Sequence, residues 1–102
     1  MSRRETLEKM LAEEPHDVFL HYALANELVK AGESSAAWER FALLHAEFPD
    51  YVPAWFRHAQ ALAEADQVDE ARTVGQQGLT VAERVGDLHA AGEIRGFLEM
   101  LP

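Results

Sequence analysis

Apolar residues recur three or four positions apart along this chain, in stretches interrupted by glycine, proline and aspartate. Residues with this spacing share one face of a helix, so the pattern predicts short amphipathic helices. Six are expected, at about residues 2–14, 18–31, 34–48, 50–66, 68–85 and 88–101. Short turns make consecutive helices antiparallel neighbours. Alanine and leucine far outnumber β-branched residues, so no strands are expected and the predicted fold class is all-α.

Residues at the expected helix ends have the types that start or stop helices. Asp17 is a suitable N-cap for the second helix, and Ser34 or Ser35 is expected to cap the third. Pro15 and Pro49 follow the first and third helices, because the residue before a proline avoids the α region. These signals place the helix boundaries within a few residues.

A shift of 34 residues superimposes the chain on itself with a weak but patterned match. Within residues 15–48, laid on residues 49–82, six positions become identical, and Tyr22 over Phe56 and Asn26 over Gln60 are conservative. The identical pairs include small alanines, which helices need where their backbones approach closely. They are Pro15/Pro49, Val18/Val52, Ala25/Ala59, Leu28/Leu62, Ala31/Ala65 and Ala37/Ala71. A period of this length indicates stacked helical hairpins.

The stretch from about residue 15 to residue 85 resembles two tetratricopeptide (TPR) repeats. The first copy carries the family pattern at Leu24, Ala25, Leu28, Gly32, Ala37, Phe41 and Pro49, and the second at Trp55, Ala59, Leu62, Ala71 and Gly78. It departs from the pattern at His21 and Leu44 in the first copy and at His58, Gly75 and Glu83 in the second. Because Glu83 stands where the closing proline would be, the last helix of the second repeat is expected to run longer than that of the first.

The resemblance implies a small bacterial-type TPR protein, a right-handed α-α superhelix of about six antiparallel helices. Residues 1–102 would form one TPR-like domain. Within it we expect an N-terminal half-repeat helix at 1–14, repeat one at 15–48, repeat two at 49–85 and a C-terminal capping helix at 86–102.

The two copies differ in where they place their large side chain. The second copy has Trp55 early and Gly75 in the aromatic position, whereas the first has His21 early and Phe41 later. We therefore expect the Trp55 indole to lie over Gly75 and Gly78, with close packing that offsets about 1 kcal/mol of helix propensity lost per glycine. In the alternative, the glycines only kink a surface helix.

Composition and charge exclude several classes of function. Nine Lys and Arg against eighteen Asp and Glu give a net charge of −9, with no clustered basic stripe for nucleic acid or an anionic membrane. With no cysteine there is no thiolate nucleophile and no cysteine zinc site. The five histidines do not form a metal-binding spacing, so His21 and His58 are interpreted as core or boundary residues. No enzyme activity, cofactor or metal is expected. Polar residues follow Met1–Arg4, so no secretory signal is expected and a cytoplasmic location is the default.

The resemblance implies a concave face, lined by the first helix of each repeat, that binds a short peptide or helix of a partner protein. The residues expected to contact it are Phe19, Tyr22, Asn26, Phe56, Arg57 and Gln60. Asn26 matches an asparagine that holds a peptide's C-terminal carboxylate in one branch of the family. The neighbouring lysine of that branch is Tyr22 here, although Arg57 can supply a bidentate contact instead.

Two alternatives remain open from the sequence. Tyr22 and Phe56 can simply pack between adjacent helices. Trp38 lies one residue from the core stripe of its helix, so it is expected to be partly exposed and able to anchor self-association. The chain would then be a structural homo-oligomerisation module, for example a homodimer. For a peptide partner, the acidic surface favours a basic one.

Overall fold

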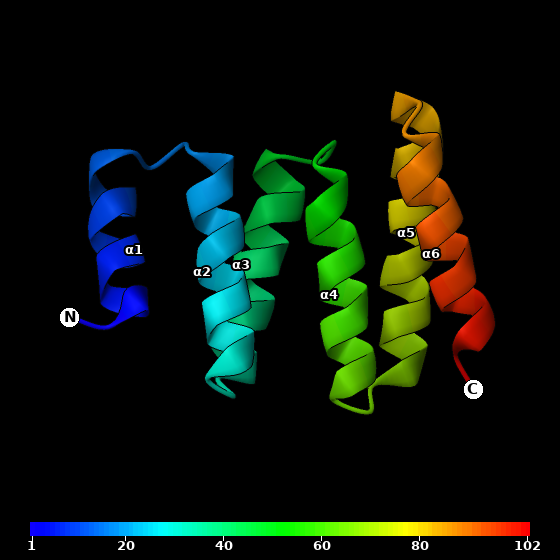
Figure 1. Cartoon of the computed structure of the whole chain (residues 1–102), viewed down its shortest axis with the longest axis horizontal. Helices are drawn as coiled ribbons and strands as arrows, with labels where there is room; N and C mark the ends of the chain where they lie inside the picture. The colour runs from blue at the N-terminus through cyan, green and yellow to red at the C-terminus, as the bar shows by residue number, and fades with distance from the viewer. The chain divides into compact units, whose positions relative to one another are not determined.

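A computed structural model describes residues 1–102 and consists of six α-helices without a strand (Figure 1). The helices are α1 (Arg3–Glu13), α2 (Val18–Lys30), α3 (Ser34–Glu47), α4 (Val52–Glu64), α5 (Val68–Val85) and α6 (Leu88–Met100). The predicted all-α class and the number of helices are confirmed. No helix combines the length and the hydropathy that a membrane span requires.

Side-chain caps stabilise the N-termini of three helices. Asp17 Oδ1 accepts hydrogen bonds from the backbone N–H groups of Phe19 and Leu20, at 2.9 and 3.3 Å. Ser2 and Glu5 form a reciprocal capping box on α1, and Asp87 caps α6. Each such bond satisfies an N–H group that has no partner within its helix.

The predicted serine cap of α3 is wrong. Ser34 is already the first residue of the helix, and its N-cap is Glu33, which makes no side-chain cap bond. The reason lies in the preceding turn. Gly32 adopts a left-handed conformation with φ of 75°, and the N–H of Glu33 donates to the Leu28 carbonyl at 3.0 Å. This C-terminal closure of α2 brings the chain into α3 one residue earlier than expected.

The turn after α4 repeats this geometry 34 residues later, with aspartate in place of glycine. Asp66 has a φ of 62°, and the N–H of Gln67 donates to the Leu62 carbonyl at 2.9 Å. The left-handed region costs a residue with a Cβ more than it costs glycine. The second repeat therefore makes the same turn with a less suitable residue.

The chain divides into two compact units, residues 1–48 and 49–102, which are described separately. In unit 1, α2 packs against both α1 and α3. Phe41 and Leu44 of α3 are fully buried. The main core cluster is built from the helical stripes that the sequence pattern predicts, and it consists of Leu7, Leu11, Leu20, Leu24, Leu28 and Ala37.

In unit 2, α5 packs against both α4 and α6. Its core cluster consists of Val52, Val81, Ala82, Ala91 and Ile94, with Trp55, Phe56, Leu79, Ala90 and Leu98 packed around it. Helix α5 has 18 residues against 14 in α3, so the prediction of a longer last helix is confirmed.

The glycines of α5 are contact points for two different helices. A Cβ placed on Gly78 would lie 2.8 Å from the Cβ of Trp55, so the prediction that Trp55 lies over Gly78 is confirmed. For Gly75 the prediction is wrong. Its nearest neighbours are Leu98 and Phe97 of α6, and a Cβ placed on Gly75 would lie 2.8 Å from the Leu98 Cδ2 atom. Because α5 is sandwiched between α4 and α6, glycines three residues apart face different neighbours.

Candidate functional site

The outer face of α2 carries three of the predicted binding residues. The opposite face is buried in unit 1 and consists of Leu20, His21, Leu24, Ala25 and Leu28. Phe19 is 67% exposed, whereas Tyr22 and Asn26 are half-buried. Their spacing of three and then four residues places all three on one side of the helix. An exposed aromatic side chain beside a half-buried tyrosine and asparagine can supply both apolar contact and hydrogen bonds.

The other three predicted residues are half-buried on α4, in unit 2. The Phe56 ring packs edge-on against the Phe97 ring of α6, with centroids 5.8 Å apart. Arg57 Nη1 lies 3.3 Å from the Glu64 carboxylate, which is 62% exposed. Phe56 thus packs between helices, and Arg57 has an internal carboxylate partner that an incoming carboxylate would have to replace. Gln60 lies one turn further along the helix.

His58 of α4 is half-buried and stays neutral at physiological pH. Burial disfavours its charged form and lowers the pKa of His58 from 6.5 to about 4. The imidazole is therefore not a source of positive charge for a ligand on this helix.

His21 takes part in a polar relay that joins α2 to α3. The ring is 5% exposed, with Nε2 2.8 Å from the Pro15 carbonyl oxygen and Nδ1 2.9 Å from Arg40 Nη1. A guanidinium can only donate hydrogen bonds, so Nδ1 is the acceptor and Nε2 carries the proton that is donated to Pro15. The prediction of a satisfied core histidine is correct for His21, but its partner Arg40 was not identified from the sequence.

A cleft beside this relay lies within unit 1. It consists of two hollows of about 230 and 330 Å³ that share Glu8, Leu24 and Arg40. Helix α1 supplies one wall and α3 the other, with α2 residues between them. The lining residues are Arg4, Glu8, Leu11, Ala12, Pro15, His21, Leu24, Leu28, Ala36, Glu39, Arg40 and Leu43.

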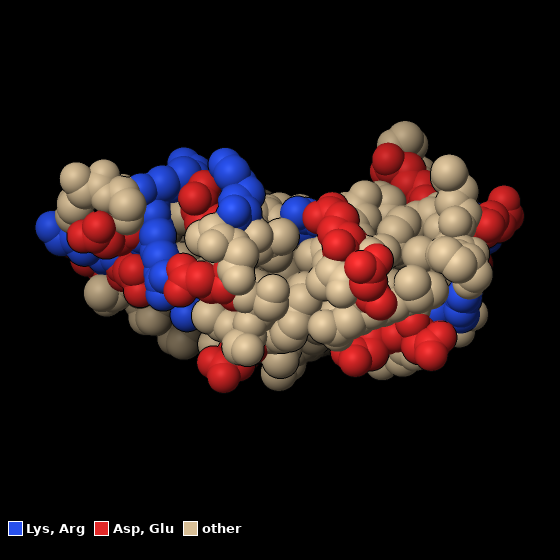
Figure 2. All heavy atoms as spheres, turned by 90° about the horizontal axis from the view of Figure 1, so that it is seen from below, with Lys and Arg blue, Asp and Glu red and all other residues tan.

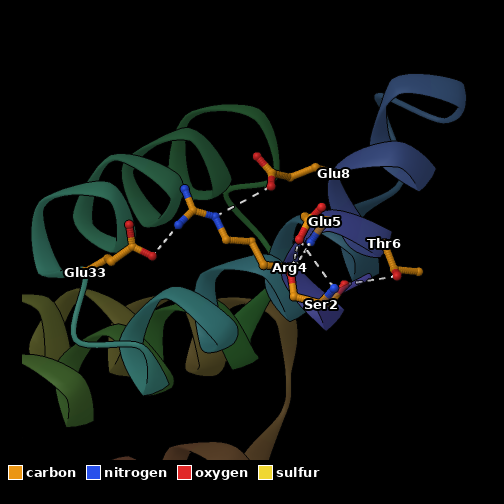
Figure 3. A network of polar contacts seen from close by, with 6 residues as sticks. All are labelled: Ser2, Arg4, Glu5, Thr6, Glu8 and Glu33. Carbon is orange, nitrogen blue, oxygen red and sulfur yellow. Dashed lines mark hydrogen bonds and ion pairs between the residues drawn. The ribbon is translucent and has the colours of Figure 1, made fainter.

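Arg4 closes one end of this cleft through a network of carboxylates (Figure 3). Its guanidinium donates to Glu33 at the start of α3 and lies 3.5 Å from Glu8 on its own helix. The hydrogen bond to Glu33 raises the pKa of Arg4 above its ordinary value. Figure 2 shows basic side chains gathered on unit 1 next to carboxylates, which agrees with these pairs and with the Arg3–Glu27 pair at 2.9 Å. The positive charge of Arg4 is thus neutralised by the carboxylates of Glu8 and Glu33.

Trp38 is less available than a surface anchor would be. It is half-buried and packs against the core cluster of unit 1, with its ring tilted against Phe41 at a centroid distance of 6.5 Å. No group of three or more His, Cys, Asp or Glu side chains is placed to hold a metal ion.

Comparison with known proteins identifies relatives that extend over nearly the whole chain. The TPR repeat-containing protein PA0015 of Pseudomonas aeruginosa is 32% identical over 97 residues, which cover 95% of this chain and 92% of that protein. No protein-family model matches the chain.

Two solved structures have a similar fold. Protein BPP2914 from Bordetella parapertussis superimposes with a TM-score of 0.83 and 25% identity, over 97% of this chain and 86% of that one. The tetratricopeptide repeat domain protein from Salinibacter ruber superimposes with a TM-score of 0.76 and 31% identity, over 82% of this chain and 85% of that one. Together with the repeated helical hairpins, these similarities show that the chain belongs to the tetratricopeptide repeat family.

Proposed function

We propose that this protein binds a short peptide or a single helix of a partner protein through the outer face of α2 in unit 1, and that the outer face of α4 in unit 2 supplies contacts of the same kind. Members of the TPR family are in general protein-interaction modules, and the chain belongs to that family. The observation that carries the finer proposal is the exposure of Phe19, 67% of whose surface is open on the face of α2 opposite the core. An aromatic side chain held open on a rigid helix is a typical anchor at protein interfaces.

The neighbouring residues determine what such a partner would look like. Tyr22 offers amphipathic contact area, and the Asn26 amide can hydrogen-bond the backbone of a bound segment. At the equivalent positions of the second repeat, Gln60 can do the same, whereas Phe56 serves mainly to position α4 against Phe97. We assign the direct apolar contact to Phe19 and Tyr22, and the polar contacts to Asn26 and Gln60.

Arg57 is the residue assigned to a carboxylate of the partner. Its present partner Glu64 is largely exposed, so the pair is weak and can be exchanged for a bidentate contact to a peptide C-terminus. The net charge of −9 would steer basic segments toward the protein, so the partner proposed is a basic peptide with a free C-terminal carboxylate. A cytoplasmic protein without enzyme activity of its own fits this role.

A displayed peptide library tests the proposal. Peptides selected on the whole chain are measured by fluorescence anisotropy against the wild type and against Phe19→Ala, Tyr22→Ala, Asn26→Ala and Arg57→Ala. We expect each substitution to weaken binding by about tenfold, as loss of one well-placed interface contact does. Gln77→Ala, on an exposed position of α5, is the matched control and should leave affinity unchanged. Equal affinity in all four variants would remove this face as the binding site.

Homo-oligomerisation is the competing outcome, and light scattering after size exclusion measures it directly. A peptide-binding module of this kind is expected to be monomeric at micromolar concentration. A dimer whose mass does not change on dilution, and which Phe19→Ala or Trp38→Ala dissociates, would favour the structural role.

A further inference from the structure

Unit 2 provides an internal reference for the His21 relay. Trp55 occupies the position 34 residues after His21, and its indole N–H donates to the Pro49 carbonyl at 2.9 Å, as His21 Nε2–H does to Pro15 at 2.8 Å. The residue equivalent to Arg40 is Val74. The bond to the proline carbonyl is thus made in both repeats, and the apolar Val74 stands where repeat one has Arg40. The hydrogen bond to the proline carbonyl therefore does not explain why repeat one has a guanidinium at residue 40.

Arg40 is unusual among the basic residues of the chain. It is half-buried, and its single hydrogen-bond acceptor is the neutral imidazole of His21. Of the other six arginines, five pair with an acidic side chain, and Arg72 donates to the Pro102 oxygen. The five are Arg3, Arg4, Arg57, Arg84 and Arg95. Charges removed from water are normally paired with an opposite charge. This chain has twice as many acidic as basic residues and still leaves Arg40 without a carboxylate.

The relay also fixes the direction of the guanidinium. With Nη1 bound to His21, the edge formed by Nε and Nη2 keeps both of its N–H donors available, and this is the edge that binds a carboxylate in bidentate fashion. Arg40 lines both hollows of the cleft between α1 and α3, which are large enough for a carboxylate side chain. We propose that this cleft binds an aspartate or glutamate side chain of a partner polypeptide, with Arg40 as its bidentate ligand.

Two carboxylates of the chain line the same cleft and set its selectivity. Glu8 is paired with Arg4, and Glu39 is exposed; neither forms an ion pair with Arg40. They repel an acidic segment of high charge density, so the cleft selects one acidic residue flanked by neutral ones rather than a polyacidic run. This site is separate from the outer faces of α2 and α4, and it does not rest on the function proposed for them.

The experiment uses the whole chain and a displayed library of peptides with blocked C-termini, so that a carboxylate can come only from a side chain. Selection is run in parallel on the wild type and on the double variant His21→Trp/Arg40→Val, which gives repeat one the pair that repeat two already accommodates. Circular dichroism and thermal unfolding verify that the variant folds, and Arg40→Gln is the second variant if it does not.

We expect the wild type alone to enrich peptides with one fixed Asp or Glu position. Replacing that residue by Asn or Gln should lower the affinity about tenfold, the effect of losing a charge-assisted bidentate contact. Glu39→Gln should tighten binding of the same peptides, and Tyr22→Ala should not change it. Two results overturn the proposal. In one, the peptides selected on the double variant carry the same acidic position; in the other, the peptides selected on the wild type carry no fixed acidic position. Loss of binding in Tyr22→Ala would assign the peptides to the outer face of α2 instead.

Discussion

The glycine contacts of unit 2 allow the cost of close helix packing to be separated from helix propensity. Gly78→Ala places a methyl group 2.8 Å from the Cβ of Trp55, well inside the 3.5–4.0 Å at which carbon atoms normally meet. The clash is with an atom next to the backbone, so α4 and α5 must move apart. Overpacking of this kind costs about 1–3 kcal/mol, against a gain of about 1 kcal/mol from replacing glycine by alanine in a helix.

Gly92→Ala in α6 is the matched control, because nothing lies within 4 Å of its added methyl group. It should raise the free energy of unfolding by about 0.5–1 kcal/mol. The propensity gain is common to both variants, so their difference isolates the packing cost of about 1–3 kcal/mol. Gly75→Ala should fall between them, because it meets the movable end of Leu98. Urea unfolding followed by circular dichroism measures all three. Equal stability of the Gly78→Ala and Gly92→Ala variants would refute the close approach of α4 and α5.

Four further predictions concern stability. Burial lowers the pKa of His58 to about 4, so the unfolded chain takes up the proton first as the pH falls. The part of the free energy of unfolding that depends on neutral His58 should therefore be complete above pH 6.5 and be lost between pH 6.5 and about 4. After allowance for partial exposure the loss is about 1–2 kcal/mol, measured as urea midpoints against pH, and it should be absent in His58→Gln. Asp17→Ala removes two cap bonds and should cost about 1 kcal/mol; an unchanged urea midpoint would contradict that cap. Phe41→Ala, at a fully buried position, should cost about 3–5 kcal/mol in the same assay, and a loss below 1 kcal/mol would show that the site is not core. Asp66→Gly should stabilise the α4–α5 turn by about 0.5–1 kcal/mol in thermal unfolding, whereas a lower melting temperature would rule out strain there.

Local signals explain why the helices could be predicted well. The apolar periodicity and the capping residues of a helix both lie within the helix or next to it. Asp17 is an example, because its cap bonds involve residues only two and three positions away. The early start of α3 was missed because the hydrogen bond from Glu33 to Leu28 belongs to the preceding turn. A serine near a helix start is a weaker signal than a glycine that closes the helix before it.

Contacts between helices were predicted only where the repeat pattern implies them. Trp55 was placed correctly over Gly78, because the pattern pairs these helix positions. Gly75 was misassigned, because its neighbour α6 lies outside the two repeats from which the prediction was made. The bond between His21 and Arg40 joins residues 19 apart and follows from no periodicity. Only comparison of His21 and Arg40 with their equivalents in repeat two could have indicated it.

The division of the chain also separates its two tryptophans, with Trp38 in the first half and Trp55 in the second. Each half thus contains one tryptophan, and the indole of Trp55 is held by the Pro49 carbonyl. When either tryptophan is replaced by phenylalanine, excitation at a wavelength that tyrosine does not absorb gives an emission signal from one half alone. Denaturation curves of the two single-tryptophan proteins would coincide for a cooperative molecule, and would separate if one hairpin stack melts before the other.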